Sequence, residues 1–273
     1  MSLLHDLPTD KQTGTWSQTG GVVNSVYPLT NIDDDKPWNP TVFTTNPTSL
    51  TIDFATAKRV DVVSFIHCKF DAAAVIHVQM NSTNTWASPT VDGTLVVAGP
   101  AEDSMPANPF IDLTAVSGYS TGGLRYLNIK IVSGQSSLLS FGNVRISGRK
   151  RTITGFTGTQ PRDRAIGASD NEGHPLIERP TDAGAQLGYG RGTRARLVSG
   201  MIRCRDAGFA DLQSWTRASR GRLKPFLLIP DSTINEAIFA KWGADGNLQR
   251  STVGPSIHDV PVEWEEVGRG LAP

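Results

Sequence analysis

Short runs of apolar residues recur through the first half of the chain, with Gly, Pro, Asn or Asp in the gaps between them. In the run at residues 125–132 (RYLNIKIV), Leu127, Ile129 and Ile131 alternate with polar neighbours, as in a strand with one wet face. β-Branched and aromatic residues dominate these runs, which favours strands over helices. The predicted strands are residues 49–54, 59–70, 73–80, 94–98, 125–132 and 138–146. Many short strands without intervening helices predict a sandwich or barrel.

The second half has a different pattern. Residues 193–205 alternate as a strand, and residues 207–219 place Phe209, Leu212 and Trp215 at spacings of three, as on one face of a helix that Asp206 can cap. Further strand-like runs follow at residues 224–230, 236–242 and 260–267. This half is predicted to be an α+β, β-rich unit with one principal helix.

Two cores fit into a chain of 273 residues. We expect a polar N-terminal arm at residues 1–20 that orders only on assembly, a sandwich at 21–150 and a second domain at 151–273. Residues 158–192 are charged and rich in Gly and Pro, and a structureless loop of that length is unusual inside a compact domain. A hairpin or an inter-subunit arm would explain it.

The first half resembles the galactose-binding-like (discoidin-type) family, whose members are jelly rolls. The matching places are an Asn-Ile-Asp-Asp-Asp loop before Trp38, the strand LTIDF, the run beginning RVDVV, the strand RYLNIKI and the closing VRISG. They span residues 22–148. The sequence departs from the family pattern at Phe54-Ala55, where Leu-Gly is usual, and in having no cysteine pair at the ends of the domain.

The second half resembles the ring-forming part of phage distal-tail and tail-tip proteins. The match lies at residues 209–231, 238–242 and 261–266, although the family usually places this part before a carbohydrate-binding-like domain. The resemblance implies a structural virion protein of the tail tip or baseplate, made in the host cytoplasm. It also implies a ring of three or six copies that contacts tube, tape-measure, hub or fibre proteins.

Charge is divided unevenly along a chain whose net charge is zero. Residues 1–148 contain 8 Lys and Arg against 12 Asp and Glu, and residues 149–273 contain 18 against 14. This division fits head-to-tail packing between copies and is too mild for nucleic-acid binding. The N-terminal sequence lacks the pattern of a signal peptide, and no apolar run approaches about 20 residues, so we expect neither export nor membrane insertion.

Three consecutive carboxylates, Asp33, Asp34 and Asp35, form the first candidate site. Carboxylate oxygens on a flexible loop are typical ligands of Ca²⁺. The alternative is a solvated acidic turn held by its own backbone contacts. No other cofactor is expected.

Aromatic side chains in the loops of the first half are candidates for glycan contact, because aromatic faces stack on sugar rings. Trp86 and Tyr119 are the better candidates, and plain packing is the alternative for both. Trp38 is expected to pack beneath the sandwich.

No catalytic constellation is found. The five histidines form no metal motif, and His67 and His77 are expected at most as a structural pair on neighbouring strands. The glycine-rich stretch at residues 188–192 precedes no convincing helix, and Glu263, Glu265 and Glu266 have no identifiable cleft around them. Cys68 and Cys204 are expected to be buried free thiols. The chain is therefore not predicted to be an enzyme.

A basic run follows the predicted helix and contains Arg217, Arg220, Arg222 and Lys224. Either the helix dipole favours these cations, or they contact the acidic first domain of the next copy. The leading hypothesis is a distal-tail-like structural subunit that holds neighbouring tail or receptor-binding proteins. The alternative is a glycan-binding module without catalytic activity, which would contact a host surface glycan.

Overall fold

The computed structural model describes residues 3–37, 39–97, 108–153, 156–158, 162–165, 177–180, 186–189, 194–220, 223–229, 237–243 and 248–267. Strands dominate this part of the chain, and its single α-helix is α1 (Asp206–Ala218). The mainly β prediction is confirmed. The described residues also include three 3₁₀ helices: η1 (Pro8–Asp10), η2 (Leu29–Asn31) and η3 (Leu113–Ala115). Among the described residues, no helix has the length and apolarity needed to span a bilayer.

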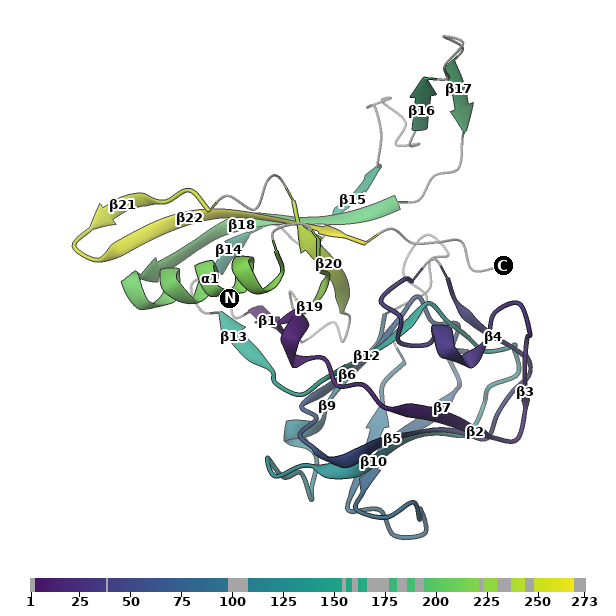
Figure 1. The fold of residues 1–273 in the computed structure, drawn as a ribbon. Helices are drawn as coiled ribbons and strands as arrows, with labels where there is room; N and C mark the ends of the chain where they lie inside the picture. The colour runs from purple at the N-terminus through teal and green to yellow at the C-terminus, as the bar shows by residue number, and fades with distance from the viewer. Residues whose placement is uncertain are drawn as a thin grey trace.

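The first half is a sandwich of antiparallel strands (Figure 1). One layer is a five-stranded sheet in the order β2 (Thr15–Thr19), β5 (Ser49–Lys58), β10 (Leu124–Ser133), β7 (Val75–Asn81) and β8 (Val91–Leu95). Two three-stranded sheets complete it. Their strands are β11 (Ser140–Phe141), β4 (Thr41–Thr45) and β3 (Val22–Val23), then β12 (Asn143–Ser147), β6 (Val62–Ile66) and β9 (Phe110–Asp112).

Alternation along these strands builds the core of the sandwich. On β5, Leu50 and Ile52 point inward and are fully buried, as are Leu127 and Ile129 on β10. They share one apolar cluster with Phe65 of β6. The period-2 pattern of the sequence is therefore the pattern of the core.

The second half is built on one large antiparallel sheet. Its order is β13 (Arg151–Ile153), β1 (Leu3–His5), β19 (Phe226–Ile229), β20 (Ile238–Trp242), β22 (Ile257–Glu266), β18 (Arg194–Arg205) and β14 (Phe156–Gly158). Two further strands lie off this path: β15 (Arg162–Ala165) pairs with β18, and β21 (Ser251–Gly254) pairs with β22. Helix α1 packs on one face through Phe209, Leu212 and Trp215, as predicted. Asp206 is the first helical residue and not the cap, which is Arg205.

The two halves share an apolar junction. On one face of β19, Phe226 and Leu228 pack in the same apolar cluster as α1. On the other face, Leu227 and Ile229 pack against the sandwich. The second pair joins a cluster with Val62 and Ile66 of β6, Phe110 of β9 and Phe239 of β20. Strands β6 and β19 are thus buried on both faces, which is why β19 is a continuous apolar run and β6 has Ser64 as its one polar residue.

The expected N-terminal arm at residues 1–20 is corrected by the structure. Leu3–His5 form β1, which lies between β13 and β19 in the second sheet, and Thr15–Thr19 form β2, an edge strand of the sandwich. Backbone pairing in two sheets orders this segment within one chain, so its order needs no partner.

Strands also occur within residues 158–192. There β15 extends the pairing along β18, while β16 (Ile177–Pro180) and β17 (Gln186–Tyr189) pair with each other and with no other described strand. This hairpin projects away from the body of the molecule (Figure 1). A hairpin was one of the two arrangements expected for the stretch.

Candidate functional site: a basic cleft and the junction beside it

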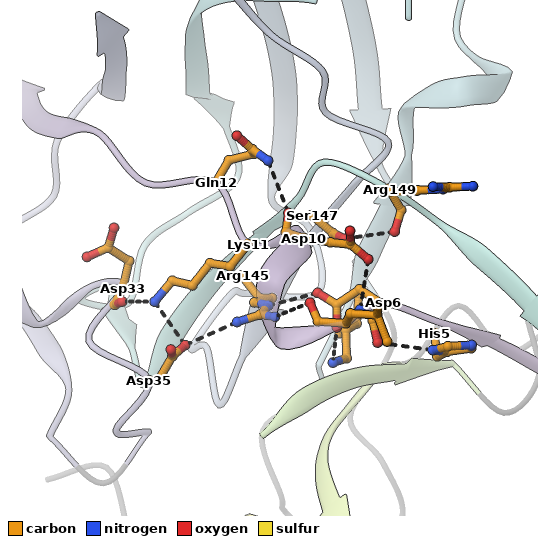
Figure 2. A network of polar contacts seen from close by, with 12 residues as sticks. His5, Asp6, Asp10, Lys11, Gln12, Asp33, Asp35, Arg145, Ser147 and Arg149 are labelled. Carbon is orange, nitrogen blue, oxygen red and sulfur yellow. Dashed lines mark hydrogen bonds and ion pairs between the residues drawn. The ribbon is translucent and has the colours of Figure 1, made fainter. Parts of the chain in front are cut away.

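A buried ion pair fastens the N-terminal segment between the two halves. Arg145 of β12 and Asp6 are each 1% exposed, and Arg145 Nε lies 2.9 Å from Asp6 Oδ2 (Figure 2). Asp6 Oδ1 also accepts a 2.6 Å hydrogen bond from the backbone N–H of Leu227, and Arg145 donates to the carbonyl of Leu7 at 3.1 Å. One carboxylate and one guanidinium thereby connect β12, β19 and the segment after β1.

A second polar contact crosses the same junction. Asn108 Oδ1 accepts a hydrogen bond from the backbone N–H of His67 at 2.7 Å. Asn108 Nδ2 donates a hydrogen bond to Glu266 Oε1 at 3.1 Å. His67 Nε2 lies 3.6 Å from the same carboxylate oxygen. Glu266 is 1% exposed, so this carboxylate of β22 is buried at the junction. His67 does not pair with His77, whose Nδ1 lies 2.7 Å from Asp92 Oδ1.

The acidic triplet is part of this framework and does not converge on one point. Asp33 accepts the indole N–H of Trp16 at 3.0 Å through its side chain and Lys11 Nζ through its carbonyl oxygen. Asp34 caps its own loop by accepting from the backbone of Lys36 at 2.8 Å. Asp35 lies 3.0 Å from Lys11 Nζ (Figure 2). Nowhere in the described chain do three His, Cys, Asp or Glu side chains form a group suited to a metal, so the predicted calcium ligands are not brought together as a set.

The two aromatic candidates for glycan contact, Tyr119 and Trp86, differ in how freely their rings could meet a sugar. Tyr119 donates its hydroxyl to the buried carboxylate of Asp61 and packs against the sandwich core, and burial and this carboxylate raise the pKa of the phenol. Trp86 lies half-exposed on the turn between β7 and β8, and its indole N–H donates to Asn84 at 3.0 Å. Only Trp86 therefore offers a ring held mainly by its own loop. Trp38 lies outside the described residues.

The basic run after α1 is exposed where the structure describes it. Arg217, Arg220 and Lys224 all point to solvent, and Arg222 lies outside the described residues. Arg220 adopts φ +49°, the left-handed conformation common just after a helix. Among the described residues, none of these three cations has a carboxylate partner within ion-pair distance, so they stay candidates for a contact with a neighbour.

Both cysteines are free thiols. Cys68 is buried, and burial raises the pKa of its thiol far above the ordinary range. Cys204 is half-buried, so the expectation of burial holds fully only for Cys68.

A cleft of about 770 Å³ opens beside the junction, between β13 and β18 and beneath α1. Apolar and aromatic residues, among them Leu7, Ile202, Leu212 and Trp215, contribute to its lining. Five cations also line it, against a single carboxylate, Asp211. The cations are Arg149, Lys150, Arg151, Arg203 and Arg205. Three of these cations already have carboxylate partners: Lys150 lies 2.5 Å from Asp112, Arg151 lies 2.9 Å from Asp10 and Arg203 lies 2.7 Å from Asp259. Much of the positive charge of the cleft is therefore neutralised within the chain.

His5 contributes a neutral ring to this lining. It stacks on Trp215 with ring centroids 3.8 Å apart, and its Nδ1 lies 3.0 Å from the carbonyl oxygen of Asp6. Burial lowers the pKa of His5 to about 4, so the ring is uncharged at neutral pH. The positive charge of the cleft comes from its Arg and Lys side chains alone.

Part of the lining of this cleft lies in a stretch that is recognisable in the sequence. Residues 147–158 are basic and contain Gly, which indicates a boundary between the halves, but Arg203 and Arg205 come from a strand about fifty residues later. The sequence does not indicate that Asp6 and Arg145 form a buried pair, because each is an ordinary charged residue in a polar or strand-like segment.

The solved structures that follow are similar to the N-terminal half of this chain. No protein-family model and no curated protein matches the sequence. Among solved structures, the chain is similar to the carbohydrate-binding module CBM32-1 of a family 31 glycoside hydrolase from Clostridium perfringens. That match has 10% identity and a TM-score of 0.38, and it covers 52% of this chain and 96% of the module.

A fucose-binding module from Streptococcus pneumoniae is similar over 53% of this chain and 96% of its own length, with 14% identity and a TM-score of 0.38. A CBM32 module of a family 89 enzyme from C. perfringens covers 52% and 98%, with 13% identity and a TM-score of 0.36. Scores this low assign neither a ligand nor an activity to the chain. The distal-tail resemblance of the second half finds no support in these comparisons and stays a prediction.

Proposed function

We propose that this protein is a non-catalytic structural subunit of a bacteriophage tail tip, with the second sheet as its assembly unit and the sandwich as an accessory carried on it. The observation that supports the proposal most is the hairpin of β16 and β17. It pairs with no third strand among the described residues and projects from the body (Figure 1). A two-stranded hairpin is marginally stable in water, so a neighbouring subunit is the natural partner to complete it.

The junction supports the same proposal. Leu227, Ile229 and Phe239 pack against β6 and β9, so the sandwich is held on the second sheet by an apolar contact instead of by a linker. A module held in this way keeps its orientation when copies assemble. Such a fixed accessory suits the outside of a ring of three or six subunits, where it would meet tube, hub or fibre proteins.

Light scattering and negative-stain microscopy of the purified chain test the proposal. We expect particles of three or six times 29.4 kDa and closed rings. A variant in which residues 177–189 are replaced by a short Gly-Ser linker should lose the rings and keep the melting temperature, since β16 and β17 pair with no other described strand. A chain that stays monomeric at every concentration would refute the assembly function.

Glycan binding by the sandwich is the second candidate, and Trp86 is the observation on this chain that favours it. Its half-exposed ring lies at the tip of the β7–β8 hairpin beside Asn84, so an aromatic face and an amide are presented together. The carbohydrate-binding modules reported above are consistent with this role. A glycan array with the wild type, Trp86→Ala and the matched control Tyr119→Phe tests it. If the wild type binds a glycan, Trp86→Ala abolishes this binding and Tyr119→Phe preserves it, the sandwich has a lectin function. If the wild type binds no glycan on the array, this candidate function is refuted.

A further inference from the structure

The basic run at the end of α1 presents an apolar side chain to solvent. Leu223, between α1 and β19, is 78% exposed, the highest value among the large apolar side chains that the structure describes. Three exposed cations, Arg217, Arg220 and Lys224, lie within six residues of it in the sequence. No Asp or Glu occurs in residues 212–230. This stretch of chain therefore combines positive charge with an exposed leucine and contains no negative charge of its own.

Hydrogen bonds anchor the run to the end of the helix. The backbone N–H of Lys224 donates to the carbonyl of Ser219 at 2.9 Å. Ser219 is fully buried, and its hydroxyl donates to the carbonyl of Trp215 at 2.9 Å. Leu223 and Lys224 thus lie on a turn that is closed against α1, so less conformational entropy is lost when they contact a partner.

The charge of the basic run is not neutralised within the described chain. No described carboxylate lies within ion-pair distance of Arg217, Arg220 or Lys224, in contrast to Arg203, which lies 2.7 Å from Asp259. The dipole of α1 favours cations near its C-terminal end, but this effect falls off within the last turn. It accounts for Arg217 and not for Lys224 or for an exposed leucine.

Cations beside an exposed leucine match the chemistry of an anionic bilayer surface. Lipid phosphates attract the cations, and an apolar side chain gains by entering the boundary between headgroups and acyl chains. A nucleic-acid backbone would pair with the cations alone. We infer that the basic run docks peripherally on an anionic lipid surface, with Arg217, Arg220 and Lys224 at the headgroups and Leu223 inserted between them. This docking needs no membrane-spanning segment, and it is independent of ring assembly because a single copy carries all four residues.

Sedimentation of the full-length chain with vesicles tests the inference. The vesicles contain phosphatidylcholine alone or with about 30% phosphatidylglycerol, in about 0.05 M NaCl, where screening of charge is weak. Arg217→Glu/Lys224→Glu reverses two charges of the run, and Leu223→Ser removes the apolar side chain. We expect the wild type to bind only the anionic vesicles. Each variant should weaken this binding at least about tenfold, since about one Lys or Arg near such a surface is worth about fivefold and burial of a leucine is worth more.

Two control variants are matched in charge and in exposure. Arg149→Glu/Arg205→Glu reverses two exposed cations elsewhere and changes the net charge by the same amount. Val26→Ser removes an apolar side chain that is 72% exposed on the sandwich. Both controls should bind the anionic vesicles nearly as well as the wild type. All substituted side chains are exposed, so an unchanged melting temperature verifies that each variant folds.

Three results would overturn the inference. The first is a wild type that does not bind the anionic vesicles, which leaves the assembly function in place. The second is binding by Leu223→Ser equal to that of the wild type, because charge alone would then suffice, or an equal loss in Arg149→Glu/Arg205→Glu, which would assign binding to overall charge. The third is binding of a fluorescent DNA oligonucleotide that Arg217→Glu/Lys224→Glu loses, without vesicle binding by the wild type, which would show a nucleic-acid site.

Discussion

His5 should make the stability of this protein fall between pH 7 and pH 5. In the unfolded chain its pKa is the ordinary 6.5, and in the folded protein burial lowers it to about 4. The unfolded state therefore binds the proton more readily, and each step down in pH through this window favours unfolding. The full difference of about 2.5 pKa units corresponds to about 3.4 kcal/mol, reached only below pH 4.

Between pH 7 and pH 5 the same linkage amounts to a loss of about 2 kcal/mol in the free energy of unfolding. Urea unfolding at the two pH values measures it, in the wild type and in His5→Phe, which keeps a ring against Trp215 and binds no proton. Other groups titrate equally in both proteins, so the wild type should lose about 2 kcal/mol more than the variant. An equal loss in the two proteins would refute the assignment of a buried, neutral His5.

The remaining predictions concern the junction and the turns. Asp6→Ala removes the closer carboxylate of the buried Arg145 and leaves only Asp35, 3.5 Å away, so it should cost about 3 kcal/mol in urea unfolding, and a cost below about 1 kcal/mol would contradict the buried pair. Phe239→Ala removes a fully buried ring from the apolar junction and should cost about 3–5 kcal/mol, with the exposed Val253→Ala as a control that costs little. Gly134→Ala places a Cβ 1.9 Å from the carbonyl oxygen of Ala73 at φ +76°, so the melting temperature should fall by several degrees, and an unchanged value would contradict this turn.

Much of the fold was predictable because local pattern decides it. The spacing of Phe209, Leu212 and Trp215 in α1 reflects one buried face, and the structure confirms it. In β10 the burial of the apolar positions Leu127 and Ile129 is confirmed, but Asn128 on the face predicted to be wet is also buried, where it bonds to Gln79. The run FLLI of β19 also carried usable information, since a continuous apolar run is typical of a strand buried on both faces. The sequence does not show that the sandwich covers its second face, which only the structure establishes.

The rest depended on contacts between distant segments. The short and mostly polar segments that become β1 and β2 gain their order from strands elsewhere in the chain, which no local pattern records. The cleft joins residues 149–152 to Arg203–Arg205, and only the sheet topology brings them together. For the same reason the triplet Asp33–Asp35 reads as a metal loop in the sequence, while in the structure Lys11 and Trp16 hold two of its members.

The position of β1 limits how this chain can be divided. Because Leu3–His5 lie between β13 and β19, a fragment that begins near residue 150 loses an interior strand of its sheet, and β13 loses its only strand neighbour among the described residues. Such a fragment should be poorly soluble, and adding the first twelve residues back as a separate peptide should restore it. During synthesis, β1 cannot pair with β19 until the ribosome has made β19, more than 200 residues later. The first residues made are therefore among the last to find their partners.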